Sequence, residues 1–187
     1  MVPPDPGSMA VTGRLELSVH ARRRSEAALV RAAKAGDGTA VEELFRRHWP
    51  GTYRAAYLVV GDAAAAEDIA QEAFLKAVAA LERFDRRRPL APWLHRIAVN
   101  RAIDWTRARR PESPDSADRP APPPDTGLSD EIVAALAALP PDRRAIVVLR
   151  HLLEYTPGEI AAMLDLPRGT VNSRLRRGLD ELERRLA

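Results

Sequence analysis

The stretch that decides the fold is residues 155–177, YTPGEIAAMLDLPRGTVNSRLRR. Thr156 is a candidate N-cap, and Glu159, three residues later, completes the pattern of a capping box. Pro167 ends this first short helix, because proline disfavours helical geometry in the residue before it. The apolar residues of a second helix recur at spacings of four, four and three: Val171, Leu175, Leu179 and Leu182. Two short helices joined by a tight turn form the helix-turn-helix pattern.

The second of these helices is basic. Between Leu166 and Arg177 every charged residue is an arginine, and short polar side chains lie near the start of the helix. Such side chains hydrogen-bond base edges and phosphates in a major groove. The candidates for contact with DNA are Arg168, Thr170, Asn172, Ser173, Arg174, Arg176 and Arg177. A plain helical hairpin with a solvated basic face would show the same pattern, so the rest of the chain must support this hypothesis.

The composition of the 187-residue chain predicts a soluble protein. It has 29% charged residues and no cysteine, which excludes disulfides, zinc–cysteine sites and thiol chemistry. The net charge is only +3, but the arginines are unevenly placed, which fits contacts with phosphates. No apolar run reaches the roughly 18 residues of a membrane span, and no signal-peptide core is present. We therefore expect a disordered leader over residues 1–24, with the origin of residues 1–8 left open, and a cytoplasmic location without membrane insertion.

Apolar spacing predicts four helices in the first 110 residues. Pro50 with Gly51 predicts a kink or break in the second helix, because proline lacks a backbone donor. The third helix has a regular apolar stripe and an opposite face rich in acids and amides. The expected helices cover about residues 25–35, 40–60, 63–83 and 92–107.

A basic block follows the third helix. Residues 86–110 contain eight arginines and one acid, Asp104, and Trp93 and Trp105 lie among the arginines. Arginine binds phosphates and flat rings stack on exposed bases, so this block suits unpaired nucleic acid. Tryptophans that simply anchor a core are the alternative.

A proline-rich segment divides the chain. Residues 111–127, PESPDSADRPAPPPDTG, contain six prolines and almost nothing apolar, as in an extended flexible linker. We therefore expect two small helical domains, residues 25–110 and 128–187. In the second, helices from Ser129 to Leu139 and from Pro140 to Leu153 support the helix-turn-helix. No stretch has the two-residue period of a strand, so the predicted fold class is all-α.

Four features in this order resemble one protein family. They are AEDIAQEAFLKA at 66–77, PWLHRIAVNRAID at 92–104, the proline-rich linker, and LPPDRRAIVVLRHLLEYTPGEIAAMLDLPRGTVNSRLRRG at 139–178. Together they resemble a bacterial RNA polymerase sigma factor of the extracytoplasmic-function (ECF) group. The resemblance covers roughly residues 25–186. It implies a promoter-specificity subunit that works with RNA polymerase core and promoter DNA, without catalytic residues, metal or cofactor.

The resemblance also implies a role for each surface. Residues 68–75 match the surface that docks on the clamp coiled coil of the β′ subunit, with candidate contacts Asp68, Gln71, Glu72, Phe74 and Leu75. The loop 85–91 and the helix after it match the segment that recognises and opens the minus-ten element, with candidates Arg88, Trp93, Arg96, Asn100 and Arg101. The second domain matches the one that binds the minus-thirty-five element and touches the β flap. Many members have a basic residue where this chain has Asn172. An anti-sigma factor is a further expected partner.

Two other functional classes remain open at this point. A conventional helix-turn-helix regulator that binds duplex DNA without polymerase core would explain residues 155–177. It needs neither the acidic and apolar helix at 66–77 nor the arginine–tryptophan block at 86–110. An enzyme has less support, because the four histidines lack metal-ligand spacing and no glycine-rich phosphate loop is present. Asp68 and Glu72 share a helix face, but no histidine partner accompanies them.

Overall fold

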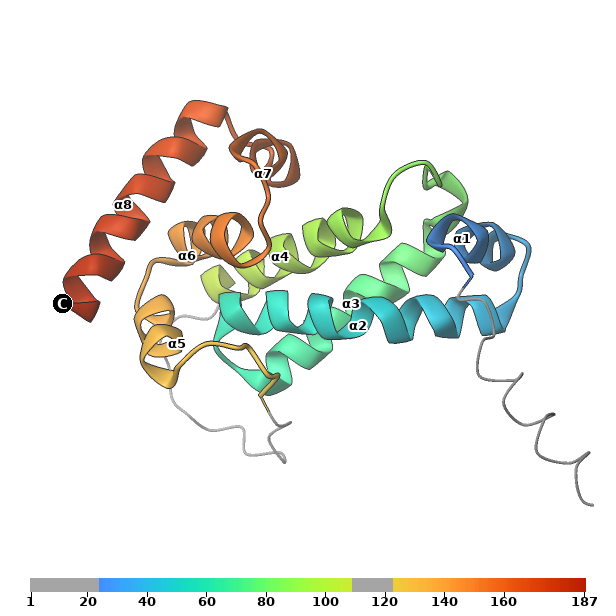
Figure 1. Ribbon diagram of the computed structural model, residues 1–187, viewed down its shortest axis with the longest axis horizontal. Coiled ribbons are helices and arrows are strands. Elements are labelled where there is room, and N and C mark those ends of the chain that lie inside the picture. The colour runs from blue at the N-terminus through green and yellow to red at the C-terminus, as the bar shows by residue number, and fades with distance from the viewer. Residues whose placement is uncertain (1–23, 109–122) are drawn as a thin grey trace, which may run out of the picture.

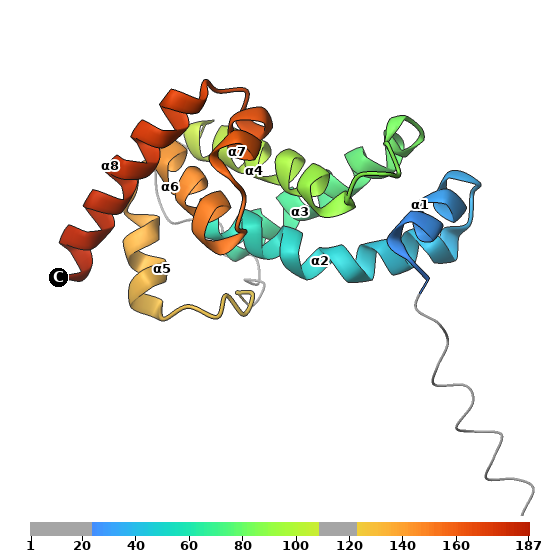
Figure 2. The ribbon, with the colours of Figure 1, turned by 45° about the horizontal axis from the view of Figure 1, so that its top comes forward.

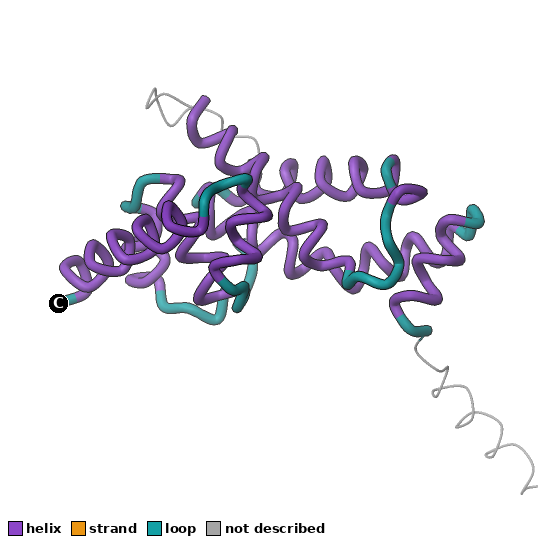
Figure 3. Tube along the Cα trace, turned by 90° about the horizontal axis from the view of Figure 1, so that it is seen from above, coloured by secondary structure: helices purple, strands orange, loops and turns teal. Residues whose placement is uncertain are grey.

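The computed structural model describes residues 24–108 and 123–187, and in these ranges every regular element is helical (Figures 1 and 3). The predicted all-α class is thus confirmed. The N-terminal part (24–108) contains α1 (Glu26–Lys34), α2 (Gly38–Val60), α3 (Ala63–Ala79), a 3₁₀ turn (Leu81–Arg83) and α4 (Leu90–Ala108). The C-terminal part (123–187) contains α5 (Asp130–Ala137), α6 (Pro141–Val147), a π turn (Val148–Leu152), α7 (Pro157–Leu164) and α8 (Arg168–Leu186). The leader up to residue 23 and the linker up to residue 122 lie outside the described residues.

Short polar side chains cap the N-termini of most of these helices. α7 starts in the expected capping box: the Thr156 hydroxyl accepts from the Glu159 amide at 3.3 Å, and a Glu159 carboxylate oxygen accepts from the Thr156 amide at 2.8 Å. Asp165 ends α7 with a φ of 52°. The other side-chain N-caps are Ser25, Asp37, Asp62 and Ser129. Local chemistry therefore sets the helix boundaries in both parts.

Of the kink or break expected in the second helix, the break is absent: α2 runs through Pro50 without interruption. Proline removes one backbone hydrogen bond, but the turns that follow it are held by burial. Ala55 and Val59 are completely buried, and the Thr52 hydroxyl donates to the carbonyl of His48 at 2.8 Å. Tertiary packing thus outweighs the local cost of proline.

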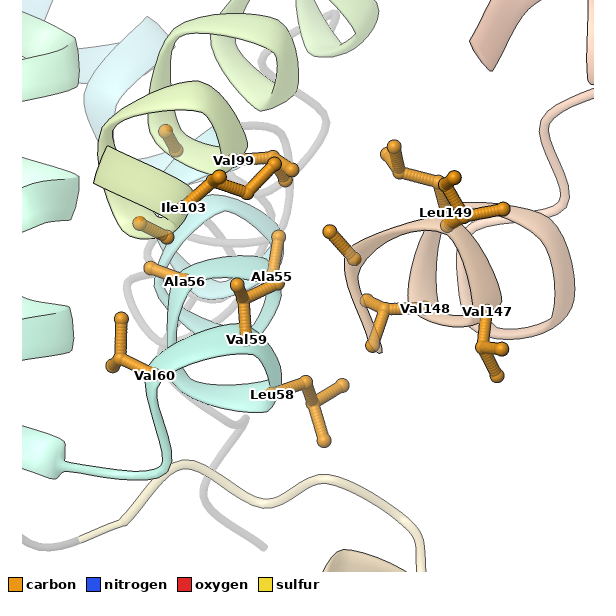
Figure 4. Packing of buried hydrophobic residues seen from close by; sticks show 14 of the residues in the cluster. Ala55, Ala56, Leu58, Val59, Val60, Val99, Ile103, Val147, Val148 and Leu149 are labelled. Atoms are coloured by element: carbon orange, nitrogen blue, oxygen red, sulfur yellow. The ribbon is translucent and has the colours of Figure 1, made fainter. Parts of the chain in front are cut away.

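Two apolar clusters hold the helices together. The smaller one packs α1 against α2, α3 and α4 through Leu29, Val30, Leu44, Phe74 and Leu94. The larger one is shared by both parts: Val59 of α2 and Val99 of α4 lie in one cluster with Ile146 of α6 and Leu149 of the π turn (Figure 4). α6 lies between α8 and the ends of α2 and α4 (Figures 1 and 2). The two predicted domains thus pack against each other through a continuous core.

A buried arginine joins the two parts. The Arg144 guanidinium donates to the carbonyl of Val59 at 2.7 Å and to that of Leu139 at 3.0 Å, and it also donates to the carbonyl of Ala137. These carbonyls lie at the C-terminal ends of α2 and α5, where the helix dipoles favour a cation. Burial lowers the pKa of Arg144. In the described parts of the chain, no helix is long and apolar enough to cross a bilayer.

We expect Gly178→Ala to destabilise the protein, because a Cβ at this position in α8 would lie 2.9 Å from a methyl group of buried Val147. Overpacking costs about 2–3 kcal/mol here, the upper part of the usual range, because a contact of 2.9 Å forces a shift of the stiff Val147 side chain, and alanine regains about 1 kcal/mol of helix propensity. A net loss of about 1–2 kcal/mol lowers Tm by roughly 2–8 °C in thermal unfolding. The matched control is Gly169→Ala in the same helix, where nothing lies within 4 Å. An unchanged Tm for Gly178→Ala would contradict this packing of α6 on α8.

Candidate polymerase and nucleic-acid interfaces

One face of α3 points outward and carries most of the predicted polymerase contacts. Asp68 and Gln71 are exposed, and Leu75 is 67% exposed although it is apolar. Glu72 is half-buried, with its two carboxylate oxygens 2.7 Å from Lys76 Nζ and 2.7 Å from Arg101 Nε. These hydrogen bonds, first that of Lys76 and then that of Arg101, hold the pKa of Glu72 below its ordinary value.

Phe74, the fifth predicted contact, lies on the opposite side of α3. It is 7% exposed, and its ring centroid is 4.8 Å from that of Phe45 and 6.0 Å from that of Trp49. Phe74 therefore supports the α3 face from inside the core. The exposed face itself consists of Asp68, Gln71, Glu72 and Leu75.

Three of the five predicted minus-ten residues line a cavity of about 680 Å³, and Asn100 and Arg101 are not among its lining residues. Arg88, Trp93 and Arg96 line one side of it, and Glu159 and Met163 of α7 line the other. Arg88 and Arg96 are exposed. Trp93 stacks on Phe84 with ring centroids 4.8 Å apart and planes inclined by 22°. Trp105, by contrast, packs against the shared core. The cavity thus combines cations with a flat aromatic surface, the combination that holds unpaired bases and their phosphates.

Two further side chains of α4 contact the C-terminal part directly. The Asn100 amide nitrogen donates to the carbonyl of Met163 at 3.0 Å. His95 Nδ1 lies 2.8 Å from the hydroxyl of Tyr155. Burial, with a smaller contribution from His48, lowers the pKa of His95 to about 4, and burial raises that of Tyr155 to about 12. Both groups are therefore neutral at pH 7, and their hydrogen bond joins the two parts without a buried charge.

The helix-turn-helix forms as predicted from α7 and α8, with Val171 completely buried at the base of α8. Arg168, Asn172, Arg176 and Arg177 are exposed. Thr170 and Ser173 are half-buried, and the Ser173 hydroxyl donates to the carbonyl of Thr170 at 3.0 Å. Arg174 is 3.3 Å from a carboxylate oxygen of Asp142. The exposed arginines therefore form a basic surface, while Arg174 is already paired with an acid.

Comparison with known proteins agrees with this geometry. The family model "Sigma-70 region 2" matches residues 44–112, and "Sigma-70, region 4" matches residues 129–182. The chain is 31% identical to the ECF RNA polymerase sigma factor SigW of Bacillus subtilis over 84% of this chain and 94% of that protein. It is 35% identical to the ECF RNA polymerase sigma factor SigM of Mycobacterium tuberculosis over 87% and 85% of the two chains. The chain belongs to the ECF group of the sigma-70 family. It is an RNA polymerase sigma factor that directs promoter recognition and transcription initiation.

Solved structures show the same fold. The structure of CnrH in complex with the cytosolic domain of CnrY covers 86% of this sigma factor and 96% of its own chain, with a TM-score of 0.65 and 27% identity. The sigma factor RpoE of Bartonella quintana, crystallised with the anti-sigma factor NepR, covers 78% and 95%, with a TM-score of 0.60 and 24% identity.

Several residues that shape the interfaces of this sigma factor had no signal in the sequence. Glu26 of α1 accepts from the Leu90 amide at 2.7 Å, so it caps α4 across 64 positions and lets this helix begin before Pro92. Asp142 of α6 pairs with Arg107 at 2.6 Å as well as with Arg174. Contacts between such distant residues leave no local pattern. Among the described residues, no three His, Asp or Glu side chains gather as metal ligands would.

We expect the stability of this sigma factor to fall as the pH falls from about 6.5 to 4, partly because of His95. The pKa of His95 in the folded state, about 4, lies below the ordinary 6.5. Between these two pH values the unfolded chain binds a proton at His95 and the folded chain does not, so acid favours unfolding. Between pH 7 and pH 5 this difference lowers the free energy of unfolding by about 2 kcal/mol. Urea unfolding at both pH values should show a smaller loss for His95→Gln than for the natural chain. His151→Gln, which removes an exposed histidine, is the control, and an equal loss in all three proteins would contradict the assignment.

Proposed function

We propose that the exposed face of α3 is the surface through which this sigma factor docks on the β′ clamp of core polymerase. The observation that carries the proposal is the Glu72–Arg101 ion pair, which connects the α3 face to α4. A partner bound on α3 therefore holds α4, the predicted minus-ten helix, in a defined position. Exposed polar side chains around an apolar Leu75 fit a partner surface that is both charged and apolar, with the charges fixing the register.

The minus-ten element is assigned to the cavity beside α4. Arg88 and Arg96 supply cations for the phosphates of an unpaired strand, and Trp93 supplies a stacking surface. Arg101, further along α4, adds a third cation once it leaves Glu72. The Asn100 amide both donates and accepts, as recognition of a base edge requires. Taking a base out of the stack costs a few kcal/mol, so the free sigma factor leaves duplex DNA closed and opening requires the polymerase.

The minus-thirty-five element is assigned to the start of α8. Arg168, Arg176 and Arg177 are exposed there for phosphate contacts, with Asn172 available to a base edge. Arg174 joins them once it leaves Asp142, and Thr170 and Ser173 add short polar contacts. The same part of the chain touches the β flap. The protein acts in the cytoplasm as a binding subunit without catalysis of its own, and an anti-sigma factor is its expected inhibitor.

We expect Gln71→Ala combined with Leu75→Ala to weaken binding to core polymerase at least tenfold. Both side chains are exposed, so their removal takes contacts from the docking face with little effect on folding. A tenfold loss corresponds to about 1.4 kcal/mol, the size of one strong interface contact. Affinity is measured by titrating fluorescent sigma factor with core enzyme. The control is Glu42→Ala, which removes an exposed acid from α2, and an affinity equal to that of the natural chain would refute the docking assignment.

We expect Arg176→Ala with Arg177→Ala to weaken promoter binding by the holoenzyme and to flatten its salt dependence. Each lost phosphate contact lowers the slope of log K against log salt by about one. The matched control is Arg184→Ala, near the far end of the same helix, where the guanidinium is bonded to the carbonyl of Asp180. If the double variant has the same salt slope as the natural chain, these two side chains do not contact DNA.

A further inference from the structure

The first helix of the chain holds both ends of the segment that joins α3 to α4. α1 lies beside this segment (Figure 1), and two of its side chains bind backbone groups there. At the first end, Lys34 Nζ donates to the carbonyl of Phe84 at 2.7 Å and to that of Glu82 at 2.9 Å. At the second end, a Glu26 carboxylate oxygen accepts from the Leu90 amide at 2.7 Å. The segment is thus fixed at two points by one helix.

The two charges of α1 match the helix ends that they meet. Lys34 binds carbonyls at the C-terminal end of the 3₁₀ turn, where the partial charge is negative, and Glu26 binds an amide at the N-terminal end of α4, where it is positive. The second oxygen of Glu26 lies 2.9 Å from His48 Nε2 of α2, so both sides of the carboxylate are engaged. The two side chains are eight residues apart, which is about 12 Å along a helix. α1 therefore acts as a rigid spacer between the two attachment points.

The arginine loop, residues 85–89, lies between these two points and is exposed throughout. A local turn gives it its shape: the Asp85 carboxylate accepts from the Arg87 amide at 3.0 Å, and the Asp85 carbonyl accepts from the Arg88 amide at 2.9 Å. A turn between neighbouring residues does not set where the loop lies on the helices around it. The contacts at its two ends do so.

The same two ends shape the cavity assigned to the minus-ten element. Phe84, at the first end, stacks on Trp93 with ring centroids 4.8 Å apart. Leu90, at the second end, begins the helix that carries Trp93. Arg88 of the loop and Trp93 both line the cavity. A shift at either end would therefore move the loop cation relative to the stacking surface, and binding groups lose specificity when they move by more than about 0.5 Å.

We propose that α1 positions the minus-ten site: Glu26 and Lys34 hold the arginine loop, and through it they set how strongly this sigma factor discriminates between minus-ten sequences. The proposal rests on the proposed function, because it takes the cavity with Arg88 and Trp93 as the minus-ten site. Both α1 side chains are half-buried and bonded to backbone groups, so they act through the loop and not on the DNA. Discrimination is a difference between two affinities, and it falls when the reading groups are free to adjust to either sequence.

The test is in vitro transcription by holoenzyme, formed from the complete chain and core polymerase, on a promoter library randomised at both elements. Sequencing the transcripts gives, for each element, the ratio of transcription between the preferred sequence and its single-base variants. Glu26→Ala and Lys34→Met should each lower the minus-ten ratio about fivefold, as expected for one lost hydrogen bond to a charged group, and leave the minus-thirty-five ratio unchanged. Loss of folded protein lowers transcription from every sequence equally, so a merely structural role would leave both ratios unchanged.

Three further variants serve as controls. Glu26→Gln keeps an oxygen for the Leu90 amide and should restore the minus-ten ratio to within about twofold of the natural value. Arg31→Ala, which removes an exposed side chain from the same helix, should change neither ratio. Trp93→Ala removes the proposed stacking surface, and Lys34→Met should lower the minus-ten ratio no further in that background, because both changes act on one contact.

Unchanged minus-ten ratios in Glu26→Ala and Lys34→Met, or equal losses at both elements, would overturn the proposal. A failure of the proposed function looks different. If Trp93→Ala leaves the minus-ten ratio unchanged, the cavity is not the minus-ten site, and the two α1 variants still decide whether α1 sets that ratio.

Discussion

The position of the C-terminal part depends on the buried guanidinium of Arg144. The last carbonyls of a helix have no partner within it, and the C-terminal ends of α2 and α5 lie near each other. One side chain satisfies both, with the Val59 carbonyl at 2.7 Å and the Leu139 carbonyl at 3.0 Å. A buried cation without such acceptors would be strongly unfavourable. The guanidinium and the two helix ends therefore require each other, and this fixes where α6 lies on α2.

The π turn after α6 determines where α7 begins relative to α4. The Leu153 amide donates to the carbonyl of Val148 at 3.1 Å, and the Tyr155 amide donates to that of Leu149 at 2.9 Å. Wide turns of this kind interrupt regular helices and often occur at functional sites. Here the turn keeps Leu149 in the core and brings Tyr155 to His95. The helix-turn-helix that follows thus starts from a fixed point on α4.

The sequence was sufficient for features that depend on neighbouring residues and insufficient for those that depend on distant ones. The capping box of Thr156 and the buried stripe position of Val171 follow from local spacing, and both are present. The prediction that α2 breaks at Pro50 was wrong, because burial of the next turns outweighs one lost hydrogen bond. The cap that Glu26 provides to α4 and the interface between the two parts join residues too far apart to leave a period.

The two predicted surfaces of the N-terminal part are not independent, and Glu72 shows why. Its two carboxylate oxygens are both engaged, one by Lys76 on the same helix and one by Arg101 on α4. A partner cation that approaches the α3 face must compete with these side chains for the same oxygens. Any contact that draws Glu72 away from Arg101 leaves a guanidinium on α4 without its acid, and so makes this helix more attractive to phosphate. The proposed docking on α3 and the proposed nucleic-acid binding on α4 would therefore be coupled through the carboxylate of Glu72.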